Sequence, residues 1–442
     1  MIFILRLNTF LLIQLLFLFV SCNESDTPFP EKVSVEINQN SDIEIIPSEP
    51  LPNSAINFSH FNHLYNEINF NEKKVGIINI YSEYPNYTYA IEPKEGFTCV
   101  DDVSRAIVML TKYLELYGHD DIALEKLKNL TEFVLQMQNQ NGYFNNFLWN
   151  DLTINTKYRT SIAVLDWWSF RALWAIESSY PFLKSDLDMA NRIAAASEKL
   201  IKNIKSDLPT SYLITEIINT IELPTWLPGK SAADQSAILI LGLLNNYKRT
   251  RDQDSKLIID HLAKGIMFMQ KGDANNYPYG AFLSSENLWH AWGNDQAYSL
   301  LRAGQAFNNQ EYIDSALLEI ENFYPWMLQN GFAEAFWINK MNNNFIEVNR
   351  NEYPQIAYGV RPMLWAASEA YYYSKDDKYL TIANKLRVWL SGENAANKAI
   401  YNPDTGVCFD GIVGPNEINM NSGAESTLET LLMLIEIEKI KK

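Results

Sequence analysis

Apolar residues recur at spacings of three and four over most of the chain from residue 99 onward, and this periodicity predicts amphipathic helices. The predicted helices span residues 102–117, 122–137, 161–178, 187–204, 231–247, 256–269, 295–307, 311–328, 354–374, 378–390 and 426–439. Several of them end at a glycine, among them Gly118, Gly331 and Gly392, which is typical of a left-handed C-terminal cap. A β-branched run at 75–81 predicts one strand.

The helices pair into a repeat. Starts marked by Asp102, Ser161, Asp234, Asp295, Gln355 and Glu425 recur at intervals of roughly 60 to 70 residues, a period typical of helical hairpins that stack on their neighbours. Residues 57–71 offer a candidate for a twelfth helix. Twelve helices in six hairpins fit an all-α closed double ring over residues 56–442, with six helices inside and six outside.

The segments between hairpins resemble one another. QMQNQNGYFNNF, MQKGDANNYPYGAF and MLQNGFAEAFW each contain a short polar run, a glycine and then aromatic residues. Similar loops in equivalent positions should lie on one rim of the ring. Because a rigid scaffold commonly presents its functional residues on loops, this rim is where we expect the site.

The N-terminus predicts export. Residues 1–22 have a short basic start, an apolar run too short to span a membrane, and the ending FVSC, which resembles the bacterial lipoprotein signal with Cys22 as the acylated residue. An ordinary secretory signal is the alternative. Residues 23–55 are rich in proline and predict a flexible tether. We therefore expect a protein of the bacterial cell envelope that is held at the membrane only by a lipid anchor.

Net charge and cysteine content exclude several kinds of partner and site. Lys and Arg number 36 against 53 Asp and Glu, for a formal net charge of −17, which argues against a nucleic-acid partner. After Cys22 only Cys99 and Cys408 remain, too few for a disulfide framework or a cysteine zinc site. They are either two buried thiols or a single bridge made as the ring closes.

Hairpin repeats with glycine-aromatic loops, acidic segments rich in tryptophan and a lipoprotein signal together resemble the six-hairpin (α/α)6-toroid glycosidases and their polysaccharide-lyase relatives. The segments EGFTCVDDVSRA and FRALWAI also resemble a helical domain found beside bacterial sugar-processing enzymes. The resemblance covers about residues 80–440. It implies that the inner helices start at the catalytic cleft, which would place Asp102, Asp234, Asp295 and Glu425 at the mouth.

Hydrolysis of a glycosidic bond needs two carboxyl groups, one protonated and one ionised. We predict Asp102 and Asp295 as this pair, with Asp101 and Glu425 as the next choices. Helix capping is the competing interpretation for each. Asp295 in particular stands where its carboxylate would accept from backbone N–H groups at a helix start.

Residues predicted to bind substrate cluster around LWHAWGND and on later loops. They are Trp289, His290, Trp292, Asn294, Trp337, Tyr353, Tyr358 and Arg159. Arg159, Arg171, Arg350 and Arg361 have two interpretations. They are partners of buried carboxylates, or they face the cleft, in which case acidic sugars become substrates.

No HExxH, GxxxxGK[ST] or GxGxxG pattern occurs, and we predict neither a metal nor a cofactor. The leading interpretation is a glycoside hydrolase acting on an oligo- or polysaccharide. The alternatives are a lyase or epimerase on the same scaffold and a glycan-binding lipoprotein without catalysis. The sugar, the linkage and the oligomeric state stay open.

Overall fold

The computed structural model describes residues 55–208 and 213–441. The predicted signal segment, Cys22 and all of the tether except residue 55 lie outside these ranges. Among the described residues, none of the helices has both the length and the apolar character needed to cross a bilayer.

Twelve α-helices are present in the described ranges. They are α1 (Ser59–Leu64), α2 (Val100–Tyr117), α3 (Asp121–Gln136), α4 (Trp167–Leu183), α5 (Leu187–Asp207), α6 (Ala233–Thr250), α7 (Gln253–Met269), α8 (Gln296–Phe307), α9 (Gln310–Asn330), α10 (Ala357–Ser374), α11 (Asp377–Arg387) and α12 (Ala424–Lys441).

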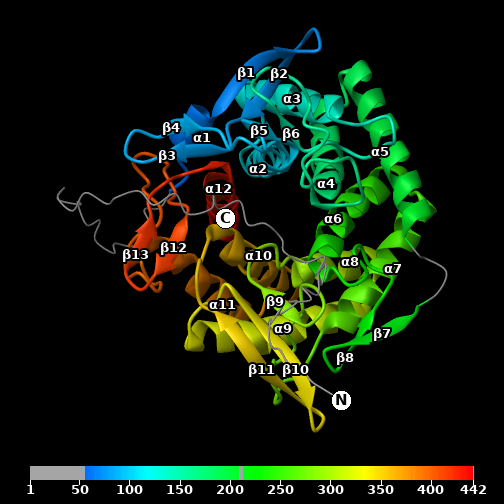
Figure 1. Cartoon of the computed structure of the whole chain (residues 1–442), viewed down its shortest axis with the longest axis vertical. Coiled ribbons are helices and arrows are strands. Elements are labelled where there is room, and N and C mark those ends of the chain that lie inside the picture. Colours follow the sequence, from blue (N-terminus) through cyan, green and yellow to red (C-terminus); the bar gives the residue numbers. More distant parts are fainter. Residues whose placement is uncertain (1–54, 209–212, 442) are drawn as a thin grey trace, which may run out of the picture. The chain divides into compact units, whose positions relative to one another are not determined.

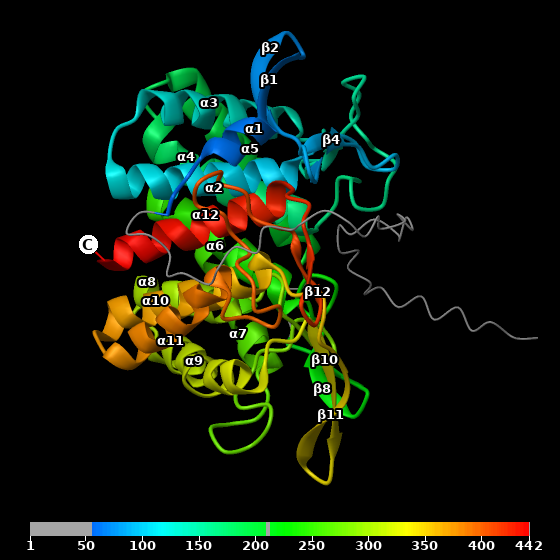
Figure 2. The same ribbon diagram turned by 90° about the vertical axis from the view of Figure 1, so that its left-hand side faces the viewer.

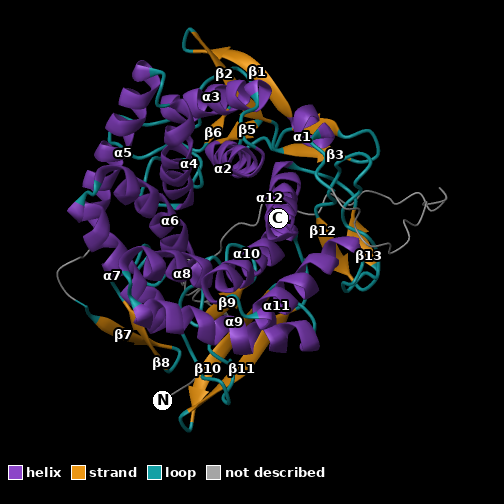
Figure 3. Ribbon diagram, turned by 180° about the vertical axis from the view of Figure 1, so that it is seen from behind, coloured by secondary structure: helices purple, strands orange, loops and turns teal. Residues whose placement is uncertain are grey.

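The even-numbered helices close into an inner ring. Each packs against the next in the order α2, α4, α6, α8, α10 and α12, and α12 packs back against α2 (Figures 1 and 3). Helices α3, α5, α7, α9 and α11 each pack outside the inner helix that precedes them, and α1 lies against α12. The predicted (α/α)6 toroid is therefore confirmed.

Burial explains which helices lie inside. Inner helices such as α10 and α12 are buried on nearly every face, including polar positions, whereas the outer helix α11 buries only Tyr379, Ile382, Ala383 and Leu386. A helix that is apolar all round must be surrounded by protein, while one with a single apolar stripe covers a core. The repeat in the sequence thus alternates two kinds of helix.

Short antiparallel strands occupy the connections. They are β1 (Tyr65–Phe70), β2 (Lys73–Ile78), β3 (Tyr81–Glu83), β4 (Thr88–Ala90), β5 (Thr98–Cys99), β6 (Phe147–Leu148), β7 (Thr215–Ile218), β8 (Ile221–Pro224), β9 (Leu288–His290), β10 (Ala335–Met341), β11 (Asn344–Asn351), β12 (Gly411–Gly414) and β13 (Glu417–Asn419). The sheet with order β11-β10-β9 has three strands, and the others have two. Figure 2 shows β8, β10, β11 and β12 gathered at the end where α12 begins.

Equivalent loops repeat the same contacts, as their sequences predict. Gln138 donates to the carbonyls of Gly142 and of Ala196 in the next outer helix. Gln270, two hairpins later, donates in the same way to Gly280 and to Ser315. In these two loops the glutamine of the polar run therefore ties one hairpin to the next.

Three of the predicted elements differ in their bounds from the structure. Helix α4 begins at Trp167 and not at 161, because Ser161 is held in the preceding loop, where its hydroxyl accepts from Phe147 N–H and donates to the Asn155 carbonyl. The twelfth helix, α1, has only six residues. The predicted strand at 75–81 is divided between β2 and the start of β3.

The inner ring depends on close approach at Gly242 of α6. A Cβ at this position would lie 2.9 Å from the backbone nitrogen of Trp174 in α4. Gly242→Ala should therefore lower the free energy of unfolding by about 1–3 kcal/mol, since the two helices must separate. Thermal denaturation checks this. In open space the same substitution would stabilise the helix by about 1 kcal/mol, so a raised melting temperature would contradict the packing.

Candidate functional site at the mouth of the ring

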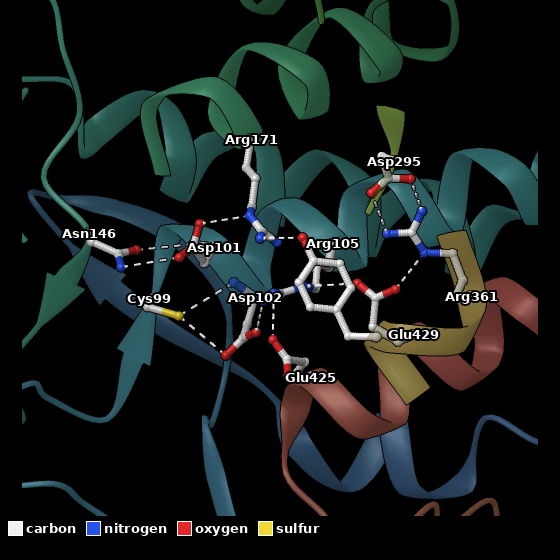
Figure 4. A network of polar contacts seen from close by, with 11 residues as sticks. Cys99, Asp101, Asp102, Arg105, Asn146, Arg171, Asp295, Arg361, Glu425 and Glu429 are labelled. Atoms are coloured by element: carbon white, nitrogen blue, oxygen red, sulfur yellow. Dashed lines mark hydrogen bonds and ion pairs between the residues drawn. The ribbon is translucent and has the colours of Figure 1, made fainter. Parts of the chain in front are cut away.

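Five of the six inner helices begin at acidic side chains, which we call the acidic mouth. Its members are Asp101, Asp102, Asp166, Asp234, Asp295 and Glu425. Figure 4 shows most of these residues joined by arginines from α2, α4 and α10. The ring thus brings together carboxyl groups that lie more than three hundred residues apart in the sequence.

Arg105 of α2 links the first inner helix to the last. Its Nη1 donates to Asp102 at 2.7 Å, its Nη2 to Glu425 at 2.6 Å and its Nε to Glu429 at 3.0 Å. All three partners are carboxylates, so Arg105 has no charge left to offer a ligand.

Arg361 of α10 continues the network. Its Nε donates to the second oxygen of Glu429 at 2.6 Å, and its two Nη groups hold both oxygens of Asp295. The side chains of Asp295, Arg361 and Glu429 are at most 1% exposed. Asp295 accepts no capping hydrogen bond from α8, so the prediction that its carboxylate caps this helix is wrong. The ion pair with Arg361 has replaced the cap.

Tyr358 lies among three guanidinium groups. Arg171 Nη2 donates to its hydroxyl at 2.6 Å, and the guanidinium carbons of Arg105, Arg171 and Arg361 lie 4.8, 5.1 and 5.5 Å from its ring centre. Burial raises the pKa of this tyrosine. Tyr358 therefore organises the arginines and is not placed to bind sugar, contrary to our prediction.

These arginines form a packed floor beneath the mouth. A cavity of about 10 Å³ lies beside them, lined by Arg105, Arg171, Arg361, Glu429 and apolar residues. A space of this size holds no more than about one water molecule. The floor therefore leaves no room for a ligand, and a ligand could bind only on its solvent side.

Asp101 and Glu425 are the network carboxylates that reach solvent most. Their side chains are 23% and 22% exposed, against 6% for Asp102 and 0% for Asp295. Asp101 Oδ1 lies 3.2 Å from Arg171 Nε, but without the geometry of a hydrogen bond. Asn146 contacts its other oxygen at 3.5 Å.

Protonation differs among the members of the mouth. Burial raises the pKa of Glu425 to about 7, although the neighbouring Arg105 acts in the opposite direction. Burial likewise raises the pKa of Asp166 to about 6, against the hydrogen bond from Trp167 N–H, with the charges of Asp101 and Asp234 adding to the increase. The mouth therefore contains carboxyl groups that hold a proton close to neutral pH.

Asp166 was absent from our predicted site. It is the N-cap of α4, and the error in the start of this helix concealed it. An aspartate directly before the apolar run WWSFRALW was the signal that would have identified it.

An aromatic pair borders the mouth on the side of α4 and α8. The rings of Trp167 and Trp292 are both half-buried, with centres 6.0 Å apart. His290 stacks on Trp292 at 3.4 Å and contacts Asp234 through Nε2 at 2.9 Å, while its Nδ1 contacts the Trp292 carbonyl. His290 thus positions Trp292, but it is only 3% exposed.

Other predicted contacts lie elsewhere. Trp289 is 1% exposed and stacks on Phe336, so it belongs to the core. Asn294 is buried, and its amide donates to the carbonyls of Ala291 and Gly359. The remaining three predicted residues are Arg159, exposed in the loop before α4, Trp337, half-buried in β10, and Tyr353, half-buried between β11 and α10.

The two cysteines do not form the bridge that was one of our alternatives. Both are free and buried. Cys99 donates through Sγ to Asp102 at 3.2 Å, and Cys408 accepts from the Thr430 hydroxyl. Within residues 55–208 and 213–441, no group of three or more His, Cys, Asp and Glu side chains is arranged to hold a metal ion.

No protein-family model matches this sequence, and the curated proteins contain no match. Solved structures do resemble it. A sugar epimerase from a ruminal bacterium has a TM-score of 0.58 at 14% identity over 88% of this chain and 96% of that one. A cellobiose 2-epimerase from Bacillus thermoamylovorans has a TM-score of 0.58 at 11% identity over 85% and 95%. A family 76 glycoside hydrolase from a bovine Bacteroides thetaiotaomicron strain has a TM-score of 0.53 at 10% identity over 84% and 75%.

These neighbours are (α/α)6-toroid enzymes, so the comparison agrees with the closed ring of α2 to α12. At 10–14% identity the likeness establishes the fold. It does not identify the reaction.

The buried position of Asp295 changes what its substitution should do. If Asp295 acted only in catalysis, Asp295→Asn would abolish activity and leave folding intact. Because the carboxylate neutralises a fully buried Arg361, the variant should lower the free energy of unfolding by about 3 kcal/mol. Asp101→Asn, at a partly exposed ion pair, should cost about 1 kcal/mol or less. Chemical denaturation of both variants measures the difference, and equal stabilities would contradict the assignment.

Proposed function

We propose that this protein is a glycoside hydrolase acting on an oligo- or polysaccharide, with Glu425 as general acid and Asp101 as its ionised partner. The observation that carries the proposal is the pairing, in one mouth, of a carboxyl group that is protonated near pH 7 with a carboxylate beside an arginine. Sugar hydrolysis requires this division of roles.

Glu425 is suited to protonate a leaving oxygen. Its pKa of about 7 lies close to the pH at which a general acid is most effective, and Arg105 fixes its orientation from below. As the bond between the anomeric carbon and the glycosidic oxygen breaks, the proton of Glu425 passes to that oxygen.

Asp101 is suited to the second role. The Arg171 guanidinium lies 3.2 Å from Asp101 and can balance a negative charge on it. Asp101 either attacks the anomeric carbon directly or takes a proton from the attacking water. The half-buried rings of Trp167 and Trp292 offer apolar faces on which sugar rings stack.

A lyase or an epimerase that uses Tyr or His as its base has less support. Tyr358 is 2% exposed and its hydroxyl accepts from Arg171, while His290 is 3% exposed with both ring nitrogens engaged. A proton-abstracting base must reach the substrate within hydrogen-bond distance. The two carboxyl groups have the better access to solvent.

Glu425→Gln should lower kcat by about 10²- to 10⁴-fold on a natural glycan, since an amide cannot supply the proton. On an aryl glycoside with a good leaving group the loss should be much smaller. In the wild type, activity should fall as pH rises above about 7, because Glu425 then loses its proton. Release of reducing ends from a polysaccharide panel measures this.

Glu436→Gln is the matched control. It makes the same change on α12, in the last part of the helix, where Glu436 pairs with Lys439. Full activity in Glu425→Gln, or recovery of bound glycan unchanged by the wild type, would contradict the proposal. The second result would favour a protein that only binds glycan.

We also propose that Cys22 is acylated and that the protein is held at the cell envelope by this lipid alone. The support is the apolar run followed by FVSC. The wild type expressed in a bacterium should incorporate labelled fatty acid and partition into detergent, whereas Cys22→Ala should do neither. Labelling of Cys22→Ala to the wild-type level would contradict the anchor.

A further inference from the structure

We infer that the reacting subsite accepts a sugar without a carboxylate, either neutral or bearing an amine, and rejects a uronate. The inference rests on the proposed function and names its substrate class. It follows from the way in which the charges of the mouth are already paired.

The arginines of the floor have no charge free for a ligand. Arg105 contacts three carboxylates, Arg361 contacts two, and Arg171 contacts Asp101 and the hydroxyl of Tyr358. These arginines are 8%, 1% and 6% exposed. For Arg171 and Arg361 the sequence left open whether they face inward or into the cleft, and the structure directs both inward.

The groups that do reach solvent are acidic. Asp101, Asp166 and Glu425 are all partly exposed around the mouth. Asp410 adds another partly exposed carboxyl beside the start of α12, where it accepts from Gly423 N–H and the Ser426 hydroxyl. A bound uronate would bring a further negative charge to this group.

That repulsion is large enough to decide specificity. Two like charges several ångströms apart near a protein surface repel by enough to weaken binding about tenfold or more. The network holds five carboxyl groups against three guanidinium groups, so negative charge stays in excess even when Glu425 carries a proton. An ammonium group on the sugar would reduce this excess.

The test uses pairs of glycans that differ only at C6. Glucan, mannan and galactan oligosaccharides are each compared with the same oligosaccharide after oxidation of its primary hydroxyls to carboxylates. The methyl ester of each oxidised form has similar size without the charge. Binding by calorimetry and cleavage by reducing-end release are measured with the full-length protein.

The oxidised member should bind about tenfold more weakly or worse at low salt, and the difference should shrink at about 0.5 M salt, where exposed charges are screened. The methyl ester should recover most of the neutral affinity, since charge and not size is excluded. An oxidised member that binds as tightly as its neutral partner would overturn the inference. So would a methyl ester as weak as the acid.

Arg159→Gln provides a second arm, because Arg159 is exposed in the loop before α4. The preference for neutral sugar should persist in this variant. If the wild type instead prefers the oxidised member and Arg159→Gln loses that preference, Arg159 receives a uronate and the inference is wrong. If no member of any pair is bound or cleaved, it is the proposed function that fails.

Discussion

The buried carboxylate of Glu429 is the interaction on which the rest of the mouth depends. One oxygen accepts from Arg105 of α2 and the other from Arg361 of α10, so α12 is bound to both of its neighbours in the inner ring. Arg361 then reaches Asp295 at the start of α8. The Glu429 side chain is 1% exposed, and the two guanidinium groups are the partners that balance its buried charge. The last inner helix is therefore closed onto the first by charge as well as by apolar packing.

This closure also determines how charge is distributed over the mouth. Three arginines form ion pairs with five carboxylates, namely Asp101, Asp102, Asp295, Glu425 and Glu429. The buried carboxylates depend most on the positive charge of the arginines, because an unpaired charge is costly away from water. Glu425, at the solvent side of Arg105, keeps a raised pKa. A network that stabilises the ring thus also leaves one carboxyl group with a raised pKa on the solvent side of the mouth.

The sequence predicted the ring because its apolar spacing is local and repeats six times, and it placed most of the acids at helix starts for the same reason. It failed where a side chain chooses between a local and a distant partner. Asp295 has helix N–H groups beside it, yet its carboxylate binds Arg361, 66 residues away. Trp289 and Trp292 are three residues apart in the sequence. Trp289 lies in β9 and stacks on Phe336 in the core, whereas Trp292 follows the strand and borders the mouth beside Trp167. Asp166 was missed because a helix boundary is the least certain feature of a periodic pattern.

The most direct measurement of this account is the titration of Glu425 in the intact protein. Glutamate labelled with ¹³C at the side-chain carboxyl, observed by NMR in the wild type and in Glu425→Gln, isolates the resonance of this one group. We expect a resonance, absent from the variant, that titrates near pH 7. A Glu425 resonance that titrates near pH 4.5, the ordinary value for glutamate, would contradict it.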